Sequence, residues 1–436
     1  MKVTLLPGGV SGSVKAIPSK SHLHRLLIFA ALANKQTHLL FEHSQAEDIK
    51  ATADCLCALG AKIETTDDGF LVTPIDRQKL PSKAVLPCME SGSTLRFMLP
   101  VVCALGVSGE FKMTGRLPER PLAPLDAELS RHGIRLWRPQ PDTLCCEGKL
   151  AAGDYTLPGN VSSQYISGLL MALPLLDQDS SLTIEEPIES ADYIAMTLRA
   201  GEVFGFLPTI IQNRYDIRGG AGFKSPGNIK AEGDWSNAAF WLCAGVMPRL
   251  ATQAAAGGSD EGIKITGLDL QSAQGDREIC AILESMGARL NWQNDLLRIS
   301  GGELRAVEID ARAIPDLVPV FCAVAAVTEG ETVIKNAQRL RIKESDRLAA
   351  TAQTLNTLGA MVTEEPTGLR IQGVKRLYGG EVDSWGDHRI AMTAAITSLA
   401  CEKEVTITNA QAVRKSYPAF WDILRALGKN IIIEEI

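Results

Sequence analysis

A two-part segment recurs six times along this chain: an apolar helix that ends at a glycine, followed by a strand, a turn and a second strand. The six glycines lie 73, 72, 82, 72 and 69 residues apart. They are Gly60, Gly133, Gly205, Gly287, Gly359 and Gly428. A repeat of this length and composition restricts the chain to an α/β fold of similar units with mixed sheets. Each unit places the start of a helix at an equivalent position, so the helix starts of several units can lie around one cleft.

The fourth copy shows why the pattern predicts these elements. Apolar side chains recur at helical spacing over residues 276–290, and Asp276 is a candidate for the residue that caps this helix. Gly287 suits the left-handed conformation at which many helices end. Asn294 and Asp295 supply a turn between two short strands. Further apolar helices are expected over residues 21–33, 92–105, 162–176, 237–246, 318–327 and 388–400.

The length of 436 residues predicts more than one domain. Six units form either a solenoid or closed groups, and a period near 70 residues is long for a solenoid. We therefore expect two domains of three units each. The glycine-rich stretch 218–227, which carries no dinucleotide-binding fingerprint, lies between the third and fourth units and predicts the break.

Composition excludes several classes of protein. The net charge of −7 argues against bulk binding of nucleic acid or of anionic membranes. The longest nearly uncharged stretch, residues 317–328, is shorter than the roughly 18 apolar residues that a membrane span needs. The N-terminus lacks the apolar run of a secretion signal. Ten cysteines without metal-binding spacing are typical of buried free thiols in a reducing compartment. We expect a soluble, cytoplasmic protein.

The predicted helix starts carry lysine or arginine beside serine, aspartate or proline. These stretches are residues 18–25 (PSKSHLHR), 90–96 (ESGSTLR), 119–121 (ERP), 161–164 (VSSQ), Ser190 with Tyr193, 343–347 (KESDR), 387–389 (DHR) and 415–418 (KSYP). The free N–H groups and partial positive charge of a helix start attract phosphate and carboxylate. Arginine adds a planar fork that matches both anions. Any one stretch alone is typical of a solvated helix start, but together they predict a site for small anions.

Two carboxylates stand among these cationic stretches. Asp316 begins an apolar helix, so it is either the cap of that helix or a proton carrier. Glu344 lies between Lys343 and Arg347. It is either one half of a surface ion pair or a second proton carrier in a cationic cleft.

The histidines do not predict a metal site. His388 follows Asp387 and is expected to orient this aspartate or a ligand. His22 and His24 lie two residues apart on a predicted helix, which points them to different faces. We therefore expect no metal.

Taken together, these motifs resemble those of the 5-enolpyruvylshikimate-3-phosphate synthase (3-phosphoshikimate 1-carboxyvinyltransferase) family over nearly the whole chain. The resemblance implies a two-domain inside-out α/β barrel built from six βαβαββ repeats, three per domain. It implies one domain over residues 18–231 and a second over residues 1–17 and 232–436, with a hinge near residues 15–20 and 228–235. The first domain would bind shikimate 3-phosphate, and the second would supply most phosphoenolpyruvate-binding and acid/base residues. The domains would close over the substrates.

The family transfers the enolpyruvyl group of phosphoenolpyruvate to the 5-hydroxyl of shikimate 3-phosphate, a step of aromatic amino acid (chorismate) biosynthesis. The resemblance implies that 3-phosphoshikimate contacts Lys20, Ser21, Arg25, Ser162, Ser163, Gln164, Ser190, Tyr193, Asp316 and Lys343. It implies that phosphoenolpyruvate contacts Lys20, Gly92, Arg120, Gln164, Arg347, Arg389 and Lys415. It implies catalytic roles for Asp316 as the base, Glu344 as the proton donor, and Lys20.

The charges are consistent with this reaction. Each substrate carries a carboxylate and a nearly dianionic phosphate, so the pair brings about six negative charges. Seven cations face them in the implied site: Lys20, Arg25, Arg120, Lys343, Arg347, Arg389 and Lys415. This count fits two small anions and leaves little for a polymer, so we expect no nucleic-acid or membrane partner. No metal or organic cofactor is required, and a monomer is expected.

Some residues depart from the family pattern. Many members have asparagine where Glu90 stands, a glycine before the Ser-Lys-Ser where this chain reads Ile17-Pro18-Ser19, and asparagine in place of Arg339. These differences concern the details of phosphoenolpyruvate contact.

Two other functions are weighed against this one. UDP-N-acetylglucosamine enolpyruvyl transferases resemble the chain in fold and chemistry, but they carry a loop cysteine where this chain has Gly115, and Lys-Asn in place of Lys20-Ser21. A non-catalytic anion-binding protein is the second alternative. It would not need both Asp316 and Glu344 among the cations.

Overall fold

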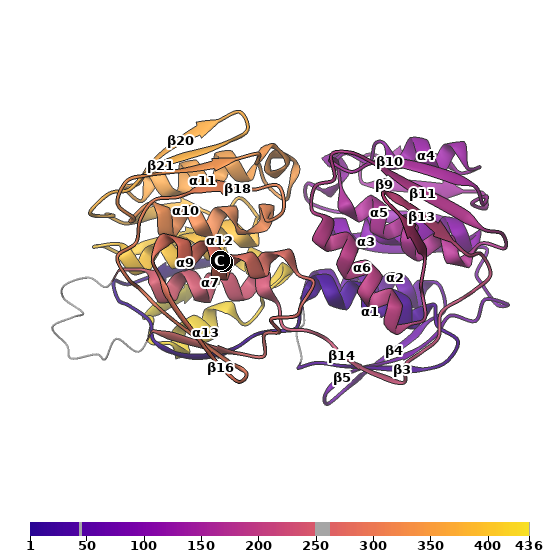
Figure 1. The fold of residues 1–436 in the computed structure, drawn as a ribbon, viewed down its shortest axis with the longest axis horizontal. Helices are drawn as coiled ribbons and strands as arrows, with labels where there is room; N and C mark the ends of the chain where they lie inside the picture. The colour runs from indigo at the N-terminus through magenta and orange to yellow at the C-terminus, as the bar shows by residue number, and fades with distance from the viewer. Residues whose placement is uncertain (43–45, 249–261, 436) are drawn as a thin grey trace. The chain divides into compact units, whose positions relative to one another are not determined.

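The computed structural model describes residues 1–42, 46–248 and 262–435 (Figure 1). The chain divides into two compact units. We call Pro18–Ala231 the continuous unit, and Met1–Ile17 with Glu232–Ile436 the discontinuous unit. Each unit contains its own cluster of buried apolar side chains. The fold and the candidate residues are therefore described one unit at a time.

Within the described residues, the strands form six four-stranded sheets that share one arrangement. In one of them, β6 (Lys83–Met89) lies parallel to β7 (Ser108–Met113), β7 is antiparallel to β9 (Thr143–Glu147), and β9 forms a hairpin with β8 (Arg135–Gln140). The helix α3 (Gly92–Leu105) connects the parallel pair, because parallel neighbours need a crossover. In every sheet a parallel pair is followed by two antiparallel pairings.

The continuous unit contains two further sheets. They consist of β14 (Asn228–Lys230), β3 (Thr37–Leu40), β5 (Gly69–Thr73) and β4 (Lys62–Thr66), and of β10 (Asp154–Pro158), β11 (Ser180–Glu185), β13 (Arg214–Ile217) and β12 (Thr209–Ile211). Its other α-helices are α1 (Lys20–Ala31), α2 (Glu47–Ala58), α4 (Leu125–Arg131), α5 (Ser163–Ala172) and α6 (Ala191–Val203). Helix α3 packs against α2 and α5, while α1 packs against α2 and α6.

The discontinuous unit has the same kinds of element. Its sheets consist of β2 (Gly12–Lys15), β15 (Ile263–Thr266), β17 (Leu296–Ser300) and β16 (Arg289–Gln293); of β18 (Glu308–Asp310), β19 (Glu331–Lys335), β21 (Gly368–Gln372) and β20 (Met361–Glu365); and of β22 (Gly380–Asp383), β23 (Val405–Thr408), β1 (Lys2–Leu5) and β24 (Ile431–Glu434). Its described α-helices are α7 (Trp235–Val246), α9 (Ile279–Met286), α10 (Val318–Ala325), α11 (Arg347–Thr357), α12 (His388–Thr397) and α13 (Phe420–Ala426).

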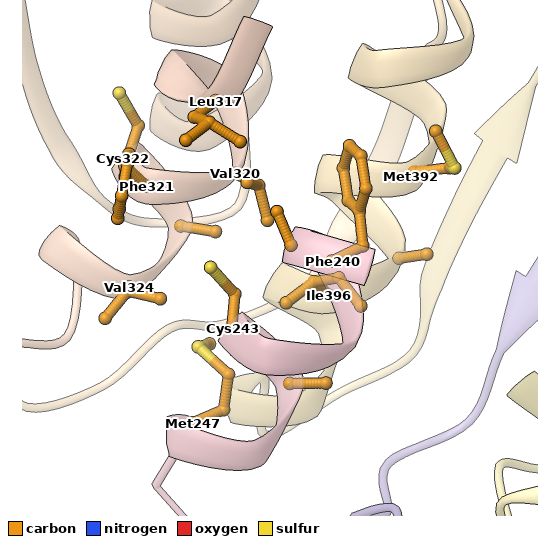
Figure 2. Packing of buried hydrophobic residues seen from close by; sticks show 14 of the residues in the cluster. Phe240, Cys243, Met247, Leu317, Val320, Phe321, Cys322, Val324, Met392 and Ile396 are labelled. Atoms are coloured by element: carbon orange, nitrogen blue, oxygen red, sulfur yellow. The ribbon is translucent and has the colours of Figure 1, made fainter. Parts of the chain in front are cut away.

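Three helices form the centre of the discontinuous unit. Figure 2 shows Phe240 and Cys243 of α7 near Val320 of α10 and Ile396 of α12, and α7 packs against both of these helices. All four side chains are buried. These helices are apolar on almost every face, as buried helices are, so they are stable only when other helices and strands surround them. The packing fixes the starts of α10 and α12, which carry candidate residues.

The glycines that end the repeated helices adopt the left-handed backbone conformation. Their φ angles lie between 78° and 106°. Gly287 is the C-cap of α9, as the sequence predicts.

Two predictions from composition can be compared with the structure. Among the described residues, no helix is both long and apolar enough to cross a membrane. All ten cysteines are free thiols; Cys57 is exposed, Cys280 is half-buried and the others are buried.

Candidate active site

The start of α1 is ordered by its cap. The Ser19 hydroxyl accepts a hydrogen bond from the backbone N–H of His22 at 3.4 Å. Lys20 Nζ pairs with Asp48 Oδ2 at 2.7 Å. The Pro-Ser-Lys-Ser stretch thus begins a helix, as predicted, and holds Lys20 beside a carboxylate of α2.

Arg25 of α1 is a buried cation with neutral partners. Its Nε donates to Thr197 Oγ1 at 2.7 Å, and its Nη2 donates to the Tyr193 carbonyl at 2.9 Å and to Ser167 Oγ at 3.3 Å. Only 2% of the residue is exposed, and burial lowers the pKa of Arg25 to about 10. Across the described residues, no carboxylate forms an ion pair with Arg25. A cation held in this way is suited to an anion supplied by a ligand.

The starts of α3 and α5 meet through Gln164. The Ser162 hydroxyl caps α5 by accepting from the Gln164 backbone N–H at 3.3 Å. The Gln164 side chain accepts a hydrogen bond from Arg96 Nη1 at 2.7 Å and donates one to Ser93 Oγ at 2.9 Å. Ser163, the first residue of α5, is buried. The predicted Ser-Ser-Gln stretch is therefore bonded to the predicted Ser-Gly-Ser stretch.

Arg120 lies against the first residue of α3. A Cβ atom added to Gly92 would lie 2.6 Å from Arg120 Nη1. The guanidinium thus occupies the space that any other residue at this position would fill. The structure brings together Gly92 and Arg120, which the sequence predicts for one ligand.

Ser190 precedes α6 in an uncommon conformation. Its φ is 56° and its ψ is 42°, which is left-handed backbone. Non-glycine residues in this region cost about 1–3 kcal/mol and cluster at functional sites. Ser190 is buried, and Tyr193 in the next turn supplies its carbonyl oxygen to Arg25.

Glu90, a departure from the family pattern, lies against Gly115. The φ of Gly115 is 55°, and a Cβ added there would lie 2.4 Å from the carboxyl carbon of Glu90. A cysteine at position 115 would therefore displace Glu90.

In the discontinuous unit, Arg347 of α11 contacts three carboxylates. Its Nη1 pairs with Asp316 Oδ1, its Nη2 with Glu344 Oε2 and its Nε with Asp387 Oδ2, each at 2.7 Å. Only 2% of its side chain is exposed. Residues from the start of α10, the start of α11 and the start of α12 are thereby joined at one buried guanidinium.

Asp316 is surrounded by cations. Besides Arg347, Arg389 Nη2 lies 3.3 Å from Asp316 Oδ2 and Lys343 Nζ lies 3.8 Å from Asp316 Oδ1. Burial acts to raise the pKa of Asp316, but Arg389, Lys343 and Arg347 together hold this pKa well below its usual range. Asp316 is therefore ionised at neutral pH. It lies in the short 3-10 segment Pro315–Leu317, and Leu317 is the N-cap of α10, so the interpretation of Asp316 as the cap of this helix is wrong.

The neighbouring groups are also buried. Burial lowers the pKa of Lys343 to about 8. Asp387 caps α12 by accepting from the Arg389 N–H at 2.9 Å, and it accepts from Ser345 Oγ at 3.1 Å. Burial acts to raise the pKa of Asp387, but Arg347 and His388 lower it below its usual value.

His388 and Lys415 complete this group. His388 Nδ1 lies 3.7 Å from Asp387 Oδ1, and Lys415 Nζ donates to the Gly386 carbonyl at 2.5 Å. Glu344 is half-buried, with 19% of its side chain exposed, so it is not one half of an ordinary surface pair. In the described part of the chain, no group of three His, Cys, Asp or Glu side chains could hold a metal ion.

Asp276 is a residue that the sequence interpretation placed wrongly. It does not cap the helix: it lies within the 3-10 segment Gly275–Glu278, and α9 begins at Ile279. The Ser236 hydroxyl donates to its Oδ2, and its Oδ1 has no hydrogen-bond partner among the described residues. Burial raises the pKa of Asp276 to about 7, with a further rise from Asp316. No local sequence signal predicts this environment, because it depends on packing against α7.

Each unit thus collects one set of candidate residues. The continuous unit contains Lys20, Ser21, Arg25, Gly92, Arg120, Ser162, Ser163, Gln164, Ser190 and Tyr193. The discontinuous unit contains Asp316, Lys343, Glu344, Arg347, Arg389 and Lys415. Fold and candidate residues together define a class of two-unit α/β proteins, with cations at helix starts and two carboxylates among the cations of one unit. A family model described as EPSP synthase (3-phosphoshikimate 1-carboxyvinyltransferase) matches residues 6–424, and the chain therefore belongs to this family.

Curated relatives agree with this assignment, and solved structures agree with the fold. A 3-phosphoshikimate 1-carboxyvinyltransferase of Clostridium perfringens is 42% identical over 98% of both chains, and one of Clostridium beijerinckii is 41% identical over 97% of both. The fold is similar to that of an EPSP synthase from Acinetobacter baumannii, with a TM-score of 0.80 and 24% identity over the full length of both chains. It is also similar to that of the enolpyruvyl transferase NikO from Streptomyces tendae, with a TM-score of 0.77 and 20% identity over 99% of this chain and 98% of the other. The predicted α/β fold class is thereby confirmed.

Proposed function

We propose that this chain transfers the enolpyruvyl group of phosphoenolpyruvate to the 5-hydroxyl of 3-phosphoshikimate and releases phosphate, as a step toward chorismate and the aromatic amino acids. The main observation is the group of Asp316 and Glu344 on the buried Arg347, each at 2.7 Å. Binding alone would need no carboxylates among the cations. Relatives that cover nearly the whole chain carry the name of this activity.

In this proposal the continuous unit supplies most contacts to 3-phosphoshikimate. They are Lys20, Ser21, Arg25, Ser162, Ser163, Gln164, Ser190 and Tyr193, joined by Asp316 and Lys343 of the other unit. Buried Arg25 supports this assignment, since its charge has neutral partners. A carboxylate or phosphate would satisfy it.

Phosphoenolpyruvate is proposed to contact Lys20, Gly92, Arg120, Gln164, Arg347, Arg389 and Lys415. Several of these cations contact protein carboxylates or carbonyls, as Arg347 does. A pair of unit charges at 4 Å is worth about 4 kcal/mol at an effective dielectric constant near 20. Losing one cation would therefore weaken binding severely.

The chemistry is an addition followed by an elimination. Asp316 accepts the proton of the 5-hydroxyl as its oxygen attacks C2 of phosphoenolpyruvate, and Glu344 donates a proton to C3. Glu344 then removes a proton from the new methyl group. The double bond re-forms as the C2–O bond to phosphate breaks, and the departing phosphate takes up the proton that Asp316 accepted. Lys20 is proposed as a third catalytic group that stabilises the developing charge.

Substrate anions can adjust the basicity of Asp316. Its pKa is held low by Arg389, Lys343 and Arg347. When substrate carboxylate and phosphate compete for these three cations, their hold on Asp316 weakens and its pKa rises. Asp316 would then be a stronger base in the complex than in the free chain.

The reaction requires both substrates to touch, so residues of both units act on one pair of molecules. We propose a hinge near residues 15–20 and 228–235, where the chain passes between the units, and closure on binding. We further propose that the protein works in the cytoplasm as a monomer, without a metal or organic cofactor, and without nucleic-acid or membrane partners.

The test is release of inorganic phosphate. Phosphate should appear only when phosphoenolpyruvate and 3-phosphoshikimate are both present, and omission of either is the internal control. Release with UDP-N-acetylglucosamine in place of 3-phosphoshikimate would instead support the alternative transferase. Binding of both substrates without release would support the non-catalytic alternative.

A further inference from the structure

Arg96 lies one turn into α3 and is almost fully buried, with 5% of the residue exposed. Its Nη1 donates to Gln164 Oε1 at 2.7 Å, and its Nη2 donates to the Pro121 carbonyl at 3.2 Å. The guanidinium carbon lies 5.4 Å from the centre of the Tyr165 ring. The proposed reaction gives Arg96 no role, although Arg96 contacts a residue proposed to bind both substrates.

The contact with Arg96 determines how the Gln164 amide points. A guanidinium has only N–H donors and no acceptor, so it requires an oxygen opposite. The oxygen of Gln164 therefore faces Arg96, and its NH₂ group faces the other way, toward Ser93 Oγ at 2.9 Å. A reversed amide would place N–H groups against N–H groups.

This orientation turns donors toward the starts of α3 and α5. One N–H of the Gln164 amide is used by Ser93, and the second N–H has no acceptor among the described residues. The Ser93 oxygen accepts from Gln164, which leaves its own hydrogen for an outward bond. Carboxylates and phosphates only accept hydrogen bonds, so a site for them needs donors. With the amide reversed, Gln164 would present an oxygen to an anion.

We propose that Arg96 is a positioning residue for phosphoenolpyruvate binding: it holds the Gln164 amide so that Gln164 and Ser93 present hydrogen-bond donors to the substrate anion. Arg96 does not touch substrate and acts through Gln164. The inference rests on the proposed function. It adds a residue that determines whether hydrogen-bond donors or acceptors of Gln164 face the substrate.

Tyr165 holds the segment after Arg120 independently of Arg96. The effect of replacing Arg96 on Gln164 can therefore be separated from a loosening of this segment. The Tyr165 hydroxyl donates to the same Pro121 carbonyl at 2.6 Å. The segment that follows Arg120 therefore keeps an anchor when Arg96 is replaced. Arg96→Met therefore removes the hydrogen bond to Gln164 while this anchor remains.

The experiment is a double-mutant cycle measured by phosphate release at saturating 3-phosphoshikimate. Arg96→Met keeps an unbranched apolar stem beside Tyr165 but removes the donors. It is expected to raise the KM for phosphoenolpyruvate about tenfold, the loss typical of one hydrogen bond to a charged group, with a smaller change in kcat. In a Gln164→Ala background, Arg96→Met should change this KM less than about twofold, because the amide it orients is absent.

Two conservative variants decide the question if Arg96→Met does not fold. Arg96→Lys keeps a donor-only group and should leave the KM for phosphoenolpyruvate within about threefold of the unmodified chain. Gln164→Glu keeps an oxygen for Arg96 but has no N–H group, and should raise the KM about tenfold. An equal loss from Arg96→Met in both backgrounds, or an unchanged KM in Gln164→Glu, would overturn the inference. If the unmodified chain releases no phosphate, the proposed function fails and the inference fails with it.

Discussion

Single residues in this protein derive their chemistry from their neighbours. Arg347 is the best example, since one buried guanidinium holds Asp316, Glu344 and Asp387 at 2.7 Å each. From the sequence, Asp316 and Glu344 could each be either structural or catalytic. In the structure both lie close to one cation. The contact with Arg347 fixes one oxygen of each carboxylate, and the second oxygen of Asp316 lies 3.3 Å from Arg389 Nη2.

Replacing Glu344 by glutamine separates binding from turnover. Glutamine keeps the shape and an oxygen for Arg347 Nη2, which lies 2.7 Å from the carboxylate in the unmodified chain, but it cannot exchange a proton. We expect kcat to fall about 10²–10⁴-fold, with substrate binding measured by calorimetry little changed. Glu331→Gln, at a surface pair with Arg370, is the matched control. An unchanged kcat in Glu344→Gln would remove Glu344 from the mechanism.

Lys343 predicts how activity depends on pH. Burial lowers its pKa to about 8, so the free chain loses this positive charge as the pH rises through that value. The kcat/KM for 3-phosphoshikimate should therefore fall above about pH 8, approaching tenfold per pH unit if the charged form alone binds. In Lys343→Arg the guanidinium stays charged, and the fall near pH 8 should disappear. The same fall in both proteins would assign it to another group.

At the scale of elements, helix starts carry the candidate residues because capping is local. Serine or aspartate caps α1, α3, α5, α7, α11 and α12 through its own side chain. A cap depends on residues within one turn, so the short polar stretches of the sequence predict it correctly. Asp276 shows the limit. Its burial against Ser236 arises from packing of segments about 40 residues apart, which no local pattern contains.

The sequence could not indicate the partners of Arg96 and Glu90, because packing between elements determines them. Both lie in a predicted motif at the start of α3, but their partners come from other elements. Arg96 contacts Gln164 of α5, and Glu90 lies against Gly115, in the loop that follows β7. Only the folded arrangement shows that these contacts exist.

The start of α3 can be tested with one methyl group. In Gly92→Ala the new Cβ would lie 2.6 Å from Arg120 Nη1, so the flexible guanidinium must move while the backbone stays in place. We expect the KM for phosphoenolpyruvate to rise about tenfold or more, with an unchanged thermal midpoint and unchanged 3-phosphoshikimate affinity. Gly301→Ala, where the nearest atom is 3.5 Å away, is the control. An unchanged KM in Gly92→Ala would place Arg120 outside the phosphoenolpyruvate site.

At the scale of the whole molecule, the division into two units predicts the order in which the substrates protect helix starts from hydrogen exchange. Most proposed contacts to 3-phosphoshikimate belong to Pro18–Ala231. This substrate alone should slow exchange chiefly at the starts of α1, α5 and α6, because bound anions hold the N–H groups of helix starts. Phosphoenolpyruvate added second should extend the protection to the starts of α11 and α12. Mass spectrometry of peptic peptides measures both steps. Protection of α11 and α12 without any at α5 would contradict the proposed division of labour.

The first strand of the chain pairs with the last ones. β1 (Lys2–Leu5) lies between β23 and β24. During synthesis at about 5–20 residues per second, β1 therefore leaves the ribosome on the order of 20–80 s before β23. Every residue of the continuous unit has been translated by position 231, so that unit can acquire its structure while the N-terminal strand still waits for its partners. The nascent chain must keep β1 unpaired throughout this interval, so Lys2–Leu5 is exposed to mispairing until β23 and β24 have been made.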